Sequence, residues 1–147
     1  MNNIVRGKDK EDNMATKADI LLVDDDRDIR DSIKIVLENN GYSIRTAANG
    51  RDALSELKKS LPDIMLLDIM MSHDTEGFDL AYELKQMPEF ENLPIIIMTS
   101  FLDKVRAEGP DQFQHILGEA WPAKWMFEKP VDIKKLIQKI EDILEMR

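Results

Sequence analysis

Short apolar runs alternate along the chain with segments of helical periodicity. A run in which every residue is apolar is typical of a strand that is covered on both faces of a sheet. The clearest such runs are Ile20–Val23, Ile64–Leu67 and Pro94–Met98, and two weaker candidates are Tyr42–Ala47 and Trp125–Glu128. The pattern therefore predicts five strands.

Between these runs, apolar residues recur every three or four positions, which is the spacing of an amphipathic helix. The helices predicted in this way cover Ile29–Leu37, Ala53–Leu61, Phe78–Leu84 and Ile133–Leu144. Asp26 and Asp132 are predicted N-caps, because a side-chain oxygen before a helix can accept from its free N–H groups. Gly41 follows the first helix, where a left-handed residue is favoured. A further, irregular helix is expected between Phe101 and Lys124.

This alternation of strands and helices predicts the fold class. Strands separated by helical connections form a parallel sheet with helices on both faces. Five such units in about 130 residues fit an α/β fold with a doubly wound five-stranded parallel sheet. They do not fit an eight-stranded barrel, which needs about 250 residues.

Length and composition narrow the picture. A chain of 147 residues has room for one domain. Residues 1–17 show no periodicity and few apolar side chains, so we expect a flexible N-terminal extension before a single domain at 18–147. The absence of cysteine excludes disulfides, thiolate zinc sites and cysteine nucleophiles.

Charge and hydropathy exclude other classes of partner. The net charge of −9 disfavours direct binding to nucleic acid, because phosphate backbones repel an acidic protein. No apolar run approaches the ~20 residues of a transmembrane helix, and the N-terminus lacks the apolar core of a secretory signal. We therefore expect a cytoplasmic protein with no membrane partner.

The residues directly after the predicted strands carry the candidate chemistry. Asp24, Asp25 and Asp26 follow the first strand, and Asp68 follows the third. Thr99 ends the fourth strand, and Lys129 comes directly after the fifth. In an open parallel sheet, ligands bind beyond the carboxyl ends of the strands. These side chains should therefore converge on one crevice.

This set of side chains favours phosphoryl chemistry. Clustered carboxylates repel one another unless a cation joins them, and ligands that are all oxygens select a hard ion such as Mg²⁺. A lysine and a hydroxyl across the crevice suit a phosphoryl group. An aspartate can itself be the nucleophile. We therefore interpret the site as one for Mg²⁺-dependent phosphoryl transfer onto Asp68.

Four motifs in this order resemble the receiver domain of two-component response regulators, of the CheY-like single-domain type with a flavodoxin-like fold. They are Val23-Asp24-Asp25-Asp26, Leu66-Leu67-Asp68, Ile97-Met98-Thr99-Ser100 and Glu128-Lys129-Pro130. The resemblance implies that Asp68 is the phosphoacceptor and that Asp24, Asp25, Asp68 and the backbone carbonyl of Met70 hold Mg²⁺.

The same resemblance implies a switch and its partners. Thr99 would be the switch hydroxyl, Lys129 would contact the phosphoryl group, and the peptide bond before Pro130 would be cis. The phosphodonor would be a histidine kinase or a phosphotransfer protein, and the output would be binding to an effector protein. The domain would not be an enzyme beyond its own phosphorylation and dephosphorylation.

The chain departs from the family pattern in three places. Ser72 stands where the family usually has proline, and Gly77 lies one residue further from Asp68 than usual. The usual switch aromatic is replaced by Met126, so Trp125 and Phe127 are the nearest candidates. The segment 100–128 is also longer than is typical, which leaves open whether switching is kept, modified or abolished.

Three functional hypotheses follow. The first is a stand-alone phosphorylation-dependent switch, since the chain ends directly after its last predicted helix. The second is a pseudo-receiver that binds partners without phosphorylation. The third is a phosphatase similar to the haloacid dehalogenases, with Asp24 as nucleophile, although a late acidic pair that such an enzyme needs does not follow Lys129.

Overall fold

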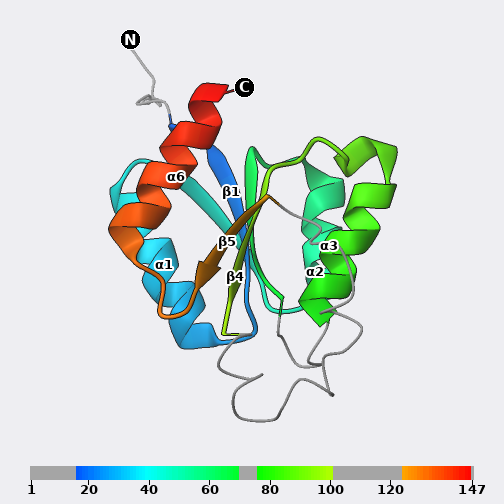
Figure 1. The fold of residues 1–147 in the computed structure, drawn as a ribbon, viewed down its shortest axis with the longest axis horizontal. Coiled ribbons are helices and arrows are strands. Elements are labelled where there is room, and N and C mark those ends of the chain that lie inside the picture. The colour runs from blue at the N-terminus through cyan, green and yellow to red at the C-terminus, as the bar shows by residue number, and fades with distance from the viewer. Residues whose placement is uncertain (1–15, 70–75, 101–123, 147) are drawn as a thin grey trace.

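The computed structural model describes residues 16–69, 76–100 and 124–146. Five strands make one all-parallel sheet in the order β2-β1-β3-β4-β5 (Figure 1). The strands are β1 (Asp19–Val23), β2 (Ser43–Ala47), β3 (Ile64–Asp68), β4 (Ile95–Thr99) and β5 (Trp125–Glu128). The predicted five-stranded doubly wound sheet is confirmed. Residues 101–123, where an irregular helix was expected, and Met70 lie outside the described residues.

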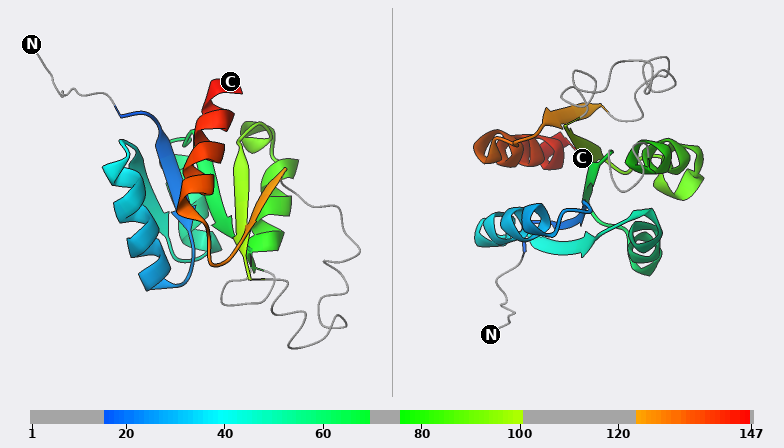
Figure 2. Two further views of the ribbon diagram at one scale, coloured as in Figure 1. Left: turned by 60° about the vertical axis from the view of Figure 1, so that its left-hand side comes forward. Right: turned by 90° about the horizontal axis from the view of Figure 1, so that it is seen from below.

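The helices cover both faces of the sheet, as the end-on view in Figure 2 shows. They are α1 (Arg27–Asn39), α2 (Gly50–Lys59), α3 (Glu76–Gln86) and α6 (Ile133–Met146), with a short 3₁₀ helix η1 (Pro88–Phe90) after α3. Successive strand residues point to opposite faces, so the apolar runs supply two cores. One core lies under α2 and α3, and the other lies under α1 and α6.

Helix α1 is bounded by the caps that the sequence predicts. The Asp26 carboxylate accepts from the N–H groups of Asp28 and Ile29, at 2.9 and 3.2 Å. At the other end Gly41 has φ 95°, the left-handed conformation that glycine adopts without strain. The N–H groups of Gly41 and Tyr42 then bond to the carbonyls of Glu38 and Leu37, which forms a Schellman motif.

Element ends differ from the expectation by one to three residues, the largest difference being the start of α2 at Gly50. Strand β2 begins at Ser43, because Tyr42 belongs to the turn that closes α1 and is buried in the core under α1 and α6. Helix α2 ends at Lys59, and Leu61 beyond it is 55% exposed. Strand β4 begins at Ile95 rather than at Pro94. In each of these three cases an apolar residue that periodicity alone assigned to the element lies just outside it.

Arg45 joins three elements at the amino edge of the sheet. Its Nη2 lies 3.0 Å from Asp19 Oδ2 on β1, and its Nη1 donates to the carbonyl of Glu56 in α2 at 2.8 Å. Nη2 also donates to the carbonyl of Ser60 at 3.0 Å. A guanidinium is suited to this task, because it carries five donors in a fixed plane. The edge strand β2 is thereby tied to β1 and to the end of α2.

The described chain begins and ends at this amino edge. The backbone N–H of Lys17 donates to the carbonyl of Gly41, and β1 starts two residues later. Helix α6 runs back against the strands, so its last turn lies near the start of β1 (Figure 1). The residues after the strands that carry polar side chains lie at the opposite, carboxyl edge. No helix among the described residues has the length and apolar character needed to cross a bilayer.

Candidate functional site

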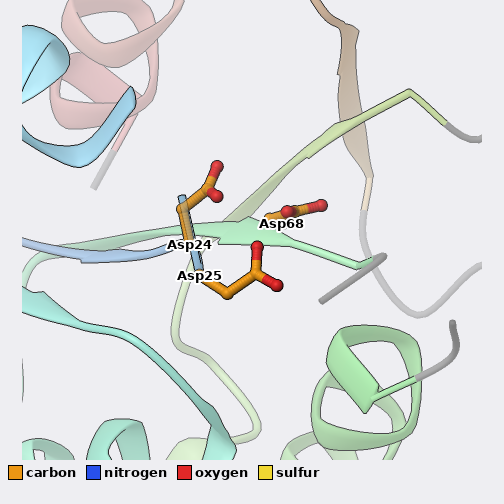
Figure 3. A group of neighbouring side chains, drawn as sticks. All are labelled: Asp24, Asp25 and Asp68. Carbon is orange, nitrogen blue, oxygen red and sulfur yellow. The ribbon is translucent and has the colours of Figure 1, made fainter. Parts of the chain in front are cut away.

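Three aspartates meet at the carboxyl edge of the sheet. Asp24 and Asp25 follow β1, and Asp68 is the last residue of β3. Because β1 and β3 are paired neighbours, with Val23 opposite Leu67, their ends lie side by side. One carboxylate oxygen from each aspartate lies within 4.8 Å of one from each of the other two. Figure 3 shows the three side chains gathered at the strand ends.

The ammonium of Lys129 lies between two of these aspartates. Its Nζ is 2.7 Å from Asp24 Oδ2 and 3.1 Å from Asp68 Oδ2. All three side chains are largely buried: Asp24 is 0% exposed, Asp68 4% and Lys129 16%. Burial by itself lowers the pKa of Lys129, but the hydrogen bonds and charges of Asp24 and Asp68 outweigh burial and raise that pKa overall. The lysine is therefore held protonated as the counter-ion of the site.

Asp24 is fixed by contacts from several elements. Its Oδ1 accepts from the N–H of Asp26 at 2.9 Å, and its own N–H donates to the carbonyl of Ala47 at 3.1 Å. Its carbonyl accepts from Nη1 of Arg30 on α1 at 2.8 Å. Together with Lys129, these contacts engage both the backbone and the side chain of Asp24. Asp25, by contrast, is exposed at the mouth of the site.

Thr99 and the Lys129–Pro130 turn complete the site. Thr99 is fully buried at the end of β4, and its carbonyl accepts from the N–H of Lys129 at 2.9 Å. The peptide bond between Lys129 and Pro130 is cis. Strand β5 and this turn thereby place Lys129 at the ends of β1 and β3, although β4 separates β5 from those strands. The four motifs that are far apart in sequence thus share one edge.

The donor set fits a small divalent cation. Three carboxylates and one ammonium leave a formal charge of −2, which a divalent ion balances. Two oxygens on one Mg²⁺ lie at most about 4.2 Å apart, because each bond is about 2.1 Å long. The observed limit of 4.8 Å is close to that value. The ligands are all hard oxygens, which Mg²⁺ prefers over softer donors.

Comparison with known proteins decides the family. The chain matches the response regulator receiver domain over residues 20–141. It belongs to the response regulator receiver family. The match covers every described strand except the first residue of β1, and all of the motifs that suggested the resemblance. This family assignment takes the place of the alternative hypothesis, in which the chain was a phosphatase similar to the haloacid dehalogenases with Asp24 as nucleophile.

The chain is also similar to individual proteins of known sequence or structure. An uncharacterized 14.6 kDa protein of Leptolyngbya boryana is 39% identical over 83 residues, covering 56% of this chain and 63% of that protein. Response regulator MprA of Mycobacterium leprae is 31% identical over 125 residues, covering 85% of this chain and 50% of that protein. The chain thus spans less than two thirds of each relative. The chemotaxis response regulator CheY4 of Vibrio cholerae has a similar structure, with a TM-score of 0.66 and 27% identity. The match covers 87% of this chain and 99% of that protein.

Receiver domains are signalling modules that bind Mg²⁺ at an aspartate cluster, and this receiver has such a cluster at Asp24, Asp25 and Asp68. Strand β5 carries the two candidates for a switch aromatic. Trp125 and Phe127 pack against the core under α1 and α6. Thr99 follows Ile95 and Ile97 in alternation on β4, which places it on the opposite face. Neither aromatic is therefore on the face of Thr99.

The residues of β5 on the face of Thr99 are Met126 and Glu128. The register pairs Ile97 with Met126 and Thr99 with Glu128. Met126 is 46% exposed and Glu128 is also exposed. The side chain at the position of the usual switch aromatic is thus a flexible thioether, and the residue in register with Thr99 on β5 carries a carboxylate.

Two contacts of this receiver domain were not anticipated from its sequence. One is the bond from Arg30 to the carbonyl of Asp24. The other is the close approach of Gly77 to the backbone of Asp68 and Ile69, which leaves no room for a Cβ at position 77. The glycine spacing signalled that this loop is unusual, but it did not show that the first turn of α3 abuts the end of β3.

Proposed function

We propose that the protein is a phosphorylation-dependent signalling switch with Asp68 as phosphoacceptor. The observation that carries this proposal is the position of Lys129, whose ammonium lies 3.1 Å from Asp68 and 2.7 Å from Asp24. An isolated pair of buried acids would resist further negative charge. A lysine in contact with both acids provides the positive charge that an incoming phosphoryl group needs.

The chain offers a complete set of groups for Mg²⁺. Asp24, Asp25 and Asp68 would hold the ion, together with the backbone carbonyl of Met70. When bound, the ion neutralises the negative charge that develops on the phosphoryl oxygens. Asp25 is the exposed ligand, so it faces the side from which ion and phosphodonor arrive.

The reaction is a transfer of one phosphoryl group. A carboxylate oxygen of Asp68 attacks the phosphorus of a phosphohistidine, which belongs to a histidine kinase or a phosphotransfer protein. The P–N bond breaks, its electron pair stays with the imidazole, and a P–O bond forms on Asp68. Lys129 then pairs with the phosphoryl oxygens, and the hydroxyl of Thr99 donates to one of them. Attack of water on phosphorus later restores the carboxylate and releases phosphate.

The output is binding to an effector protein. Phosphate contacts to Lys129 and Thr99 would bias a two-state equilibrium of the neighbouring surface. The proposal includes a cytoplasmic location and no direct contact with nucleic acid. The net charge of −9 supports the last point, because DNA and RNA would repel the domain.

Phosphorylation from a small-molecule donor tests the proposal. The protein is incubated with Mg²⁺ and acetyl phosphate, and its intact mass is measured. We expect an increase equal to one phosphoryl group, which hydroxylamine removes because it cleaves acyl phosphates. Asp68→Asn should abolish the adduct, and omission of Mg²⁺ should do the same.

The matched control is Asp31→Asn, which changes an exposed aspartate on α1 whose ion pair, within the described part of the chain, is with exposed Arg27. This variant should be phosphorylated as the wild type is. Absence of any adduct on the wild-type chain would instead support the phosphorylation-independent pseudo-receiver. An adduct that persists in Asp68→Asn would assign the acceptor to another residue.

A further inference from the structure

The backbone before Asp25 is held by three restraints on Asp24, in addition to the ion pair between the Asp24 carboxylate and Lys129. The N–H of Asp24 donates to the carbonyl of Ala47 on β2, and its carbonyl accepts from Nη1 of Arg30 at 2.8 Å. Its Oδ1 also accepts from the N–H of Asp26. Of these three restraints, that of Arg30 is the one made by a charged side chain of another element, and it links the loop to α1.

Asp25 depends on this backbone for its position. Its carboxylate is exposed, and it makes no hydrogen bond or ion pair with any other part of the chain that the structure describes. The carbonyl of Asp24 and the N–H of Asp25 belong to one planar peptide unit. A bond that fixes this carbonyl therefore fixes the plane from which the side chain of Asp25 departs.

The helix dipole alone does not favour the position of the Arg30 guanidinium. It folds back toward the start of α1, where the helix dipole is positive and disfavours a cation. Arg27, on the first turn of the same helix, has its side chain 84% exposed and lies 3.7 Å from Asp31, its one ion-pair partner among the described residues. A solvated arginine is thus the local alternative, and Arg30 adopts the bonded position instead.

We propose that Arg30 is a positioning residue, which holds the Asp24–Asp25 peptide so that Asp25 is presented to the divalent cation. This inference rests on the proposed metal site. It assigns to Arg30 no contact with the ion or with the phosphoryl group. Its effect passes through one backbone carbonyl.

The affinity for Mg²⁺ tests the inference, because replacement of Arg30 has two effects on this affinity and they have opposite signs. Loss of the positive charge alone would strengthen binding of a cation to an acidic site. Loss of the restraint on Asp25 would weaken it. We expect Arg30→Met to raise the dissociation constant for Mg²⁺ roughly three- to tenfold, in line with the loss of one hydrogen bond from a charged donor. Isothermal titration with MgCl₂ measures this constant.

Arg27→Met is the matched control, since it removes the same charge from the first turn of the same helix. It should leave the Mg²⁺ affinity unchanged or slightly increased. Arg30→Lys, which keeps a cationic donor, should recover part of the lost affinity. The thermal unfolding midpoint of each variant in EDTA shows whether the fold is intact. If Arg30→Met does not fold, Arg30→Gln is measured in its place.

The outcomes separate this inference from the proposed function. Unchanged or tighter Mg²⁺ binding by Arg30→Met, in a wild-type background that binds Mg²⁺ and is phosphorylated on Asp68, overturns the positioning role alone. A wild-type chain that binds no divalent cation overturns the metal site and, with it, the role of Arg30. Weaker binding with an unchanged unfolding midpoint supports both.

Discussion

At Lys129, burial and charge act in opposite directions on one proton. Burial favours the neutral amine, whereas Asp24 and Asp68 favour the ammonium, and the net effect raises the pKa of Lys129 above its usual 10.5. A cation whose pKa is raised by folding stabilises the fold fully below its unfolded pKa. That stability is lost as the pH rises through the folded pKa, which here lies in the alkaline range above 10.5.

Replacement of Lys129 should therefore destabilise the metal-free domain. Lys129→Met leaves Asp24 and Asp68 buried without their counter-ion, and we expect a loss of about 3 kcal/mol in the free energy of unfolding. Millimolar Mg²⁺ should restore part of the lost free energy of unfolding, because the ion replaces the missing positive charge. Urea unfolding with and without Mg²⁺ measures both effects.

The control for this prediction is Lys135→Met, which changes an exposed lysine on α6. It should unfold as the wild type does. The difference between the wild type and Lys129→Met should shrink above pH 10.5, where Lys129 loses its proton. A difference that persists unchanged to strongly alkaline pH would contradict the charge-based explanation.

Tyr42 differs from Lys129, because its buried polar group has no partner in the described part of the chain that compensates for burial. Its side chain is 3% exposed, and its hydroxyl has no hydrogen-bond partner among the described residues. Burial, followed by the charge of Glu141, raises the pKa of Tyr42 above 10.0. The unfolded chain therefore loses the Tyr42 proton first as the pH rises, and the folded state loses stability above pH 10.

Tyr42→Phe should be tolerated. We expect the free energy of unfolding to be unchanged or up to about 1 kcal/mol higher at neutral pH, because an unpaired buried hydroxyl is removed. Above pH 10 the variant should be more stable than the wild type. Tyr82→Phe, at a ring that is 43% exposed, provides the comparison. A large loss of stability in Tyr42→Phe would show that the hydroxyl has an essential partner.

At the scale of elements, local rules explain the two ends of α1 and the start of α6. The caps at Asp26 and Asp132 and the left-handed turn at Gly41 were all predicted, because each depends on a few adjacent residues. The end of α2 and the start of β2 were misplaced by one or two residues. There an apolar side chain, Leu61 or Tyr42, continues the pattern past the point where the backbone turns.

The contacts of Arg45 with β1 and with the end of α2, here called the clamp, should affect the stability of the fold but not the aspartate site. Arg45→Met removes the bonds to Asp19, to the carbonyl of Glu56 and to the carbonyl of Ser60. We expect the free energy of unfolding to fall by about 2 kcal/mol, since these hydrogen bonds have a charged donor. Chemical denaturation measures this loss.

The affinity for Mg²⁺ should be unchanged in Arg45→Met, because the clamp and the aspartates lie at opposite edges of the sheet. Arg51→Met, at an exposed arginine on α2, should alter neither quantity. A weakened ion affinity in Arg45→Met would indicate that the amino edge is coupled to the site.

At the scale of the whole molecule, the topology explains why the site could be predicted so far. In a parallel sheet every strand ends at the same edge, so Asp24, Asp68, Thr99 and Lys129 had to meet. The hydrophobic pattern of the sequence cannot show the contacts that backbone atoms make with other elements. The carbonyl of Asp24 that binds Arg30, and the approach of Gly77 to β3, are of that kind.

The sequence also could not show on which face of the sheet the aromatic residues of β5 lie. Trp125 and Phe127 were the candidates because they flank the usual position of the switch aromatic. Their orientation depends on the register of β5 against β4, which pairs Met98 with Phe127 and so places both aromatics on the face of α1 and α6. One residue of register decides the face.

Binding of the ion should stabilise the entire domain. A ligand that binds only the folded state adds about 1.4 kcal/mol when its concentration is ten times the dissociation constant. For a domain of this size we expect a rise of about 5 °C in the thermal unfolding midpoint. Differential scanning calorimetry in MgCl₂ and in EDTA measures the shift.

Asp25→Ala should remove this shift, because it deletes the exposed ligand of the acidic cluster. Asp31→Ala, an exposed aspartate on α1 outside the cluster, should keep it. An equal shift in both variants would mean that Mg²⁺ acts on the general charge of the surface rather than at this site.

The placement of both ends of the described chain has a practical consequence. The start of β1 and the last turn of α6 lie at the edge of the sheet that is remote from the aspartates. A fluorescent reporter or an affinity handle fused at either end of the domain would stand clear of an approaching kinase. Live measurements of phosphorylation could therefore use tagged protein without obstructing the chemistry they report.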